Sequence, residues 1–119
     1  MTQDSRQVLI ELLFLSLYLD NQLSLAEDGV LNEALDTLGW ESEQPRDKFI
    51  LRAFASAREA AADAIKTEAY LDSRTGIIKR DATEAISLTW LYRVLSADGL
   101  TSEEKRFLDQ IEKRLYPDA

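Results

Sequence analysis

The chain has 119 residues, of which 45% are hydrophobic and 30% are charged, and these values are typical of one globular domain rather than of a disordered segment. It contains no cysteine and no histidine, which excludes disulfides, thiolate chemistry and the most common zinc ligands. Its formal net charge of -8 disfavours nucleic acid and anionic membrane surfaces as partners. We therefore expect a single domain over residues 1–119.

The longest apolar run, residues 8–19, is too short to cross a bilayer, which takes about 20 residues, and no leader-like segment opens the chain. This favours a soluble, cytoplasmic protein without direct membrane insertion. The sequence also holds no nucleophile motif and no phosphate-binding glycine loop, so we expect a protein that is not an enzyme.

The negative charge is concentrated near the start of the chain. Residues 1–41 contain one base, Arg6, against eight carboxylates, which are Asp4, Glu11, Asp20, Glu27, Asp28, Glu33, Asp36 and Glu41. Such a segment attracts cations or a basic surface. We therefore expect a protein partner of basic character, bound either to this acidic face or to an aromatic patch near Trp40, Tyr70 and Tyr116. The sequence does not indicate an oligomeric state.

Apolar residues recur at spacings of three and four along nearly the whole chain, which contains only four glycines and two prolines. This pattern predicts an all-α protein. A first helix is expected near residues 4–20, and because it is apolar almost all round it should be central. A second should run from Ser24, with Glu27 completing a capping box, to Leu38, where Gly39 would end it in a left-handed conformation.

The middle of the chain is rich in alanine. After Pro45 the spacing predicts either one long helix or two abutting helices, with a narrow alanine face that allows close packing. The segment 71–76 (LDSRTG) is rich in turn-forming residues and predicts a break. Further helices are expected from Asp81 to about Ser96 and from Ser102 to about Leu115.

The two ends of the chain resemble each other when they are offset by 77 residues. Leu9 then aligns with Ile86, Leu13 with Trp90, Ser24 with Thr101, Glu27 with Glu104 and Leu38 with Leu115. The predicted fold is therefore a compact bundle of five to seven helices, built from two similar helical hairpins that are joined by an alanine-rich middle helix.

Both hairpins turn through a similar sequence: Asp20 to Glu27 in the first, and Asp98-Gly99-Leu100-Thr101-Ser102-Glu103-Glu104 in the second. The pattern Asp-Gly-x-Leu-Ser/Thr-x-x-Glu after an apolar helix resembles that of TerB-like domains, the family of the bacterial tellurite-resistance protein TerB. The resemblance implies a wholly helical bacterial domain with pseudo-twofold character, a link to stress responses, and metal binding through acidic clusters.

The resemblance and the acidic turns together suggest a cation site. Because only oxygen ligands are available, calcium or magnesium would be the ion. The candidate ligands are Asp20, Glu27, Asp28, Asp98, Glu103 and Glu104. A pseudo-twofold axis would bring four of them, Asp20, Asp28, Asp98 and Glu103, together into one site. An EF-hand is excluded because Leu25 and Leu31 occupy its glycine and glutamate positions. The alternative is purely structural: Glu27 and Glu104 close capping boxes, while Asp20 and Asp98 only end helices.

Overall fold

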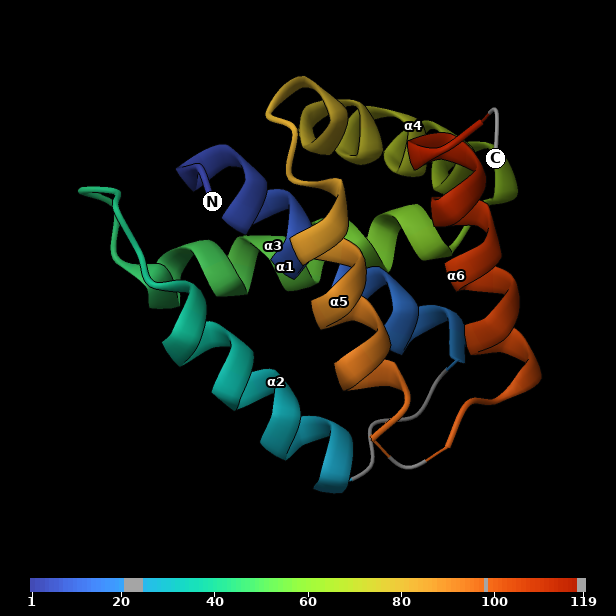
Figure 1. The fold of residues 1–119 in the computed structure, drawn as a ribbon, viewed down its shortest axis with the longest axis horizontal. Coiled ribbons are helices and arrows are strands. Elements are labelled where there is room, and N and C mark those ends of the chain that lie inside the picture. The colour runs from blue at the N-terminus through green and yellow to red at the C-terminus, as the bar shows by residue number, and fades with distance from the viewer. Residues whose placement is uncertain (21–24, 98, 118–119) are drawn as a thin grey trace.

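The computed structural model describes residues 1–20, 25–97 and 99–117. Within these ranges the chain is helical, with no strand (Figure 1). The helices are α1 (Gln3–Asp20), α2 (Leu25–Leu38), α3 (Arg46–Ala61), α4 (Ala64–Arg80), α5 (Glu84–Leu95) and α6 (Ser102–Leu115). The prediction of an all-α bundle of five to seven helices is confirmed.

Helix α1 lies at the centre of the bundle, as its nearly uniform apolar character predicts. It contacts α3, α4, α5 and α6, and its residues from Val8 to Ser16 are buried except Glu11. The ring of Phe14 stacks on that of Phe54 from α3, with 3.9 Å between centroids. The alanine face of α3, formed by Ala53, Ala57 and Ala60, is buried, and such small side chains allow two helices to approach closely.

The terminal helices pack between the two predicted hairpins rather than within the first one. Helix α2 of the first hairpin packs mainly against α5 of the second, while α6 of the second contacts α1 of the first as well as its own partner α5 (Figure 1). Each hairpin therefore covers apolar surface of the other. The end of α1, the start of α2, the end of α5 and the start of α6 all lie in the lower part of Figure 1.

The middle of the chain forms two helices, and the predicted break at residues 71–76 is wrong. Helix α4 runs through this segment without interruption, and the chain instead breaks at Ala62 and Asp63. The Asp63 carboxylate accepts hydrogen bonds from the backbone N–H groups of Ile65 and Lys66 and so caps α4. Within α4, the Thr75 hydroxyl donates to the Leu71 carbonyl, a local bond that a helix accommodates.

The start of the fifth helix also differs from the prediction. Asp81 follows the end of α4, and α5 begins at Glu84 after Thr83. The Asp81 side chain does not cap α5 because it accepts hydrogen bonds from Thr2 and Ser5 at the start of α1. The Asp81 side chain thus takes part in a tertiary contact with α1, and α5 begins three residues later than predicted.

Other helix ends follow the sequence closely. Gly39 has φ 77° and ends α2 as predicted, because glycine adopts this conformation without strain. Helix α6 has the predicted bounds and begins with a capping box from Thr101 and Glu104. Ser24, the predicted cap of α2, lies outside the described residues. None of the described helices combines the length and the apolar character that a membrane crossing requires.

Candidate functional site

The best-defined polar structure near the turns is the capping box of α6. The Thr101 backbone N–H donates to Glu104 Oε1 at 2.9 Å, and the Glu104 N–H donates to Thr101 Oγ1 at 3.1 Å. The box holds the Glu104 side chain against the first turn of the helix. Only 3% of the surface of Glu104 is exposed, so its carboxyl group lies inside the protein.

Thr101 also connects the two hairpins. Its hydroxyl donates to Oδ1 of Asp20, the last residue of α1, at 3.2 Å. A chain of hydrogen bonds therefore runs from the Glu104 N–H through the Thr101 hydroxyl to the Asp20 carboxylate. This chain fixes Asp20 beside the start of α6.

Glu27 and Glu104, which are equivalent positions of the repeat, meet at this junction. Both are buried, and their side chains are hydrogen-bonded. Burial raises the pKa of Glu104, and the Glu27 hydrogen bond and the charges of Glu27 and Asp20 raise it further, whereas the Thr101 N–H acts in the opposite direction. Two carboxyl groups this close repel each other when both are charged, and a proton or a cation can relieve that repulsion. We call Asp20, Glu27 and Glu104 the turn cluster.

The other predicted ligands have different surroundings. Asp28 is exposed and accepts a hydrogen bond from Asn32 at 3.4 Å. Glu103 is exposed and lies 3.8 Å from the guanidinium of Arg106, one turn further along α6. Asp98 lies outside the described residues. The structure thus brings Asp20, Glu27 and Glu104 together, while Asp28 and Glu103 contact Asn32 and Arg106 of their own helices.

No group of three or more carboxylates over residues 1–20, 25–97 and 99–117 has an arrangement that would itself hold a metal ion. The turn cluster does fit a hard cation in its chemistry, because its donors are all carboxylate oxygens. Magnesium needs only one or two protein carboxylates, since water fills its other positions. The described residues would therefore supply part of a coordination shell.

Ion pairs with arginine neutralise many of the carboxylates in residues 1–41. Five of the eight carboxylates in residues 1–41 pair with arginines, and these are Asp4, Glu11, Glu33, Asp36 and Glu41. Four of the five pairs reach α3, α4 or α5, so they connect segments far apart in the chain. The other three carboxylates are Asp20, Glu27 and Asp28, at the end of α1 and the start of α2. Ion pairs with arginine thus neutralise five of the eight carboxylates of the acidic face predicted from the sequence.

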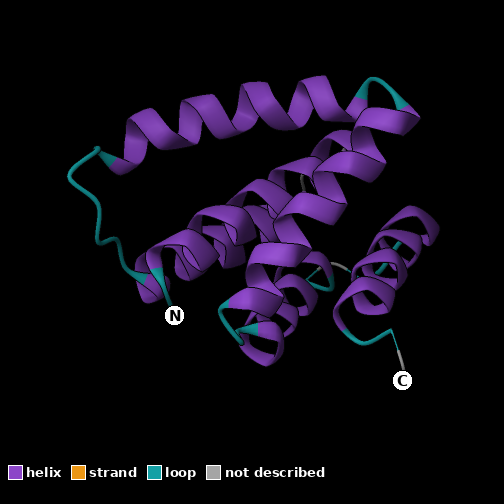
Figure 2. Cartoon of the chain, turned by 90° about the horizontal axis from the view of Figure 1, so that it is seen from above, coloured by secondary structure: helices purple, strands orange, loops and turns teal. Residues whose placement is uncertain are grey.

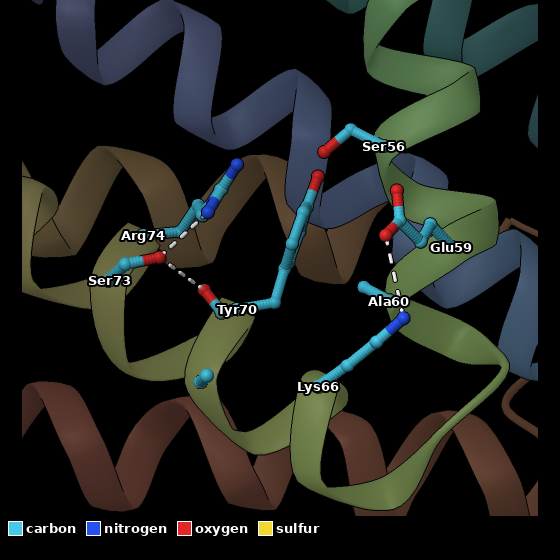
Figure 3. Close-up of a pocket in the computed structure, with 8 residues that line it drawn as sticks. Ser56, Glu59, Ala60, Lys66, Tyr70, Ser73 and Arg74 are labelled. Atoms are coloured by element: carbon cyan, nitrogen blue, oxygen red, sulfur yellow. Dashed lines mark hydrogen bonds and ion pairs between the residues drawn. The ribbon is translucent and has the colours of Figure 1, made fainter.

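A hollow lies between α3 and α4, with a volume of about 440 Å³. Figure 3 shows Ser56 and Glu59 of α3 facing Lys66, Tyr70 and Arg74 of α4. The small side chains of Ala60 and Ala69 also line the hollow, which leaves space between the two helices. Sequence reasoning did not find this feature, because the small residues were interpreted only as a packing face.

The charged side chains that line this hollow all have ion-pair partners. Arg74 pairs with Glu11 at 2.8 Å and covers the Tyr70 ring at 3.8 Å, and Lys66 lies 3.4 Å from Glu59 at the rim. Burial, with the Glu11 charge, raises the pKa of Tyr70 to about 12, so its hydroxyl stays protonated. The hollow therefore has no excess charge of either sign with which to attract an ion.

The predicted aromatic patch is not a common exposed surface. Tyr70 is buried beneath the Arg74 guanidinium. The Trp40 indole N–H donates to the Gln44 carbonyl at 2.7 Å, and its ring packs against Phe49. Trp40 thus holds the loop between α2 and α3, and of the three aromatics only Tyr116 is exposed.

No family model matches the chain, and no similar protein was found among curated proteins or solved structures.

Proposed function

We propose that this protein is a non-enzymatic binding module of the TerB-like kind, acting in a bacterial cytoplasm, and that it binds a divalent cation at the turn cluster. The observation that carries the proposal is the meeting of Glu27 and Glu104, two repeat-equivalent carboxyl groups, beside Asp20. A role in a tellurite-type stress response, and a protein partner of basic character, rest on the resemblance and the charge distribution alone.

A cation would relieve a real electrostatic cost at this site. Both glutamates are buried, and burial and the neighbouring carboxylates raise the pKa of Glu104, so its ionisation opposes folding. A divalent ion would offset the negative charges of Glu27, Glu104 and Asp20. Calcium and magnesium are the favoured ions because carboxylate oxygens are the ligands they prefer.

Calorimetric titration with calcium, magnesium and manganese at pH 7 tests the proposal, together with thermal unfolding in each ion and in a chelator. We expect binding heat for at least one ion and a higher melting temperature in its presence, since a ligand of the folded state stabilises it. Glu104→Gln should abolish both effects, because it removes a central carboxylate.

Glu103→Gln is the matched control. It removes the same charge from the residue that precedes Glu104 in α6, but the Glu103 side chain is exposed and lies beside Arg106. Equal losses in the two variants would show that only general negative charge attracts the ion. Absence of heat and of any thermal shift at millimolar ion concentration would refute cation binding.

A further inference from the structure

Arginine pairing is nearly complete in this protein, and the exceptions lie together. Seven of its nine arginines form ion pairs with carboxylates. The two others are Arg52 and Arg58, both exposed on α3. Over the ranges that the structure describes, neither has an ion-pair partner, and Arg52 lies beside the neutral Gln44 amide. The chain contains 22 Asp and Glu residues, so the lack of a partner at these two arginines does not come from a shortage of carboxylates.

These arginines belong to one face of α3. Lys48, Leu51, Arg52, Ala55 and Arg58 follow spacings of three and four residues and are all exposed. The opposite side of the helix packs on α1, and Figure 2 shows α3 along the upper edge of the molecule, with its outer side open. We call these five residues the α3 outer face.

Leu51 lies among the cations of this face and is 71% exposed. One turn later, Ala55 presents a small side chain. A large residue next to a small one forms a ridge and a groove, which is the surface that a second helix can pack against. The carboxylates of Asp47 and Glu59 are also exposed beside this face. It thus combines an apolar contact point with three cations and two anions, which leaves a net positive charge.

We propose that the α3 outer face is a docking surface for an acidic amphipathic helix of a partner protein. The unpaired cations would form ion pairs with acidic side chains at the edges of that helix, while its apolar residues would contact Leu51 and Ala55. This surface is distinct from the turn cluster, and the proposal does not depend on cation binding.

Charge and composition favour a protein over other anionic partners. Recognition of anionic lipid typically uses clusters of four to eight basic residues, more than the three on this face. Nucleic-acid binding would use the cations without giving Leu51 a role, and the net charge of -8 would oppose it. A second copy of the chain would bring the same net repulsion over its whole surface.

The test uses two fluorescent helical peptides of about 18 residues, long enough to form a helix alone. Both carry leucines at spacings of three and four, and their other positions hold mainly glutamate in one peptide and lysine in the other. Anisotropy titrations measure affinity, and amide chemical shifts locate the contact. We expect the glutamate peptide to bind and to shift resonances along α3, and the lysine peptide to leave the α3 resonances unchanged.

The triple variant Lys48→Glu/Arg52→Glu/Arg58→Glu should weaken binding of the glutamate peptide by about tenfold or more. Its matched control is Lys79→Glu/Lys105→Glu/Lys113→Glu, which changes the net charge by the same amount at three exposed lysines outside α3. The control should bind like wild type. Leu51→Ala, which alters no charge, should also weaken binding and separates a docking defect from misfolding.

Several results would overturn the proposal. Equal losses of affinity in the two triple variants would mean that net charge alone governs binding. Equal binding of both peptides at the α3 outer face would mean that this face does not select an acidic helix. Sedimentation showing that the α3 outer face mediates self-association would make a second copy the occupant. Binding to phosphatidylserine vesicles or single-stranded DNA through this face, without peptide binding, would assign it to those partners instead.

Discussion

The Thr101 hydroxyl donates a hydrogen bond to the Asp20 carboxylate at 3.2 Å, across 81 positions of the chain. The same hydroxyl accepts a bond from the Glu104 N–H, so one threonine both caps α6 and joins the two hairpins. This dual use reconciles the two interpretations of the turns. Capping residues hold α6 in place, and their arrangement also brings carboxyl groups of both repeats together.

The raised pKa of Glu104 predicts an unusual dependence of stability on pH. Below its ordinary value of 4.5, Glu104 is protonated in both the folded and the unfolded chain. As pH rises above 4.5, the unfolded chain ionises first, so the free energy of unfolding should fall until the folded group ionises too. Urea unfolding in a chelator, measured from pH 4.5 to 8, should show this fall.

Glu104→Gln should remove that fall, because the amide does not titrate in this range while its oxygen still accepts the Thr101 N–H. Glu103→Gln should leave the fall in place. Asp81 does not confuse the comparison, since its hydrogen bond with Arg80 lowers its pKa to about 2 and its contribution disappears only as the pH falls toward that value. A wild-type profile that rises from pH 4.5 to 8 would contradict the assignment.

The turns show how far local sequence can predict this fold. Thr101, Glu104 and Gly39 act through neighbours within a few residues, and the structure has them in their predicted roles. The segment 71–76 misled because its polar residues favour turns in isolation, whereas burial of Leu71 and Thr75 keeps α4 continuous. Tertiary packing thus outweighed local preference in the middle of the chain.

Asp63 is the residue that caps α4 after the break, and its substitution tests where the break lies. Asp63→Ala should destabilise the protein by about 1 kcal/mol, the usual effect of losing a side-chain cap. Asp63→Asn should retain most of the stability, because its amide oxygen can accept the same bonds from Ile65 and Lys66. Chemical denaturation of both variants measures the difference, and equal losses would show that the carboxylate charge, rather than the cap, matters.

Two fully buried serines make opposite predictions. Within the described part of the chain, the Ser87 hydroxyl has no hydrogen-bond partner, so Ser87→Ala should stabilise the protein by about 1 kcal/mol. The Ser5 hydroxyl is bonded to Asp81 and Thr83, so Ser5→Ala should destabilise it by about 1–2 kcal/mol. Thermal unfolding of the two variants provides the measurement. Destabilisation by Ser87→Ala would show that the Ser87 hydroxyl forms a hydrogen bond in the folded protein.

The candidate site was only partly predictable. The repeat identified Glu27 and Glu104 as equivalent residues, but their contact depends on α2 packing against α5, which no local pattern specifies. The long-range pairing of Glu11 with Arg74 and of Glu33 with Arg93 was equally hidden. These pairs decide which acidic residues remain at the surface, and sequence spacing contains no information about them.

Paramagnetic broadening by manganese tests the central claim most directly, because the effect falls steeply with distance from the bound ion. At substoichiometric manganese, the amide resonances of Glu27, Thr101 and Glu104 should broaden first. A chelator should restore them, and Glu104→Gln should prevent the effect while Glu103→Gln should not. Broadening centred instead on exposed carboxylates such as Glu43 and Asp47, or no selective broadening, would contradict cation binding at the turn cluster.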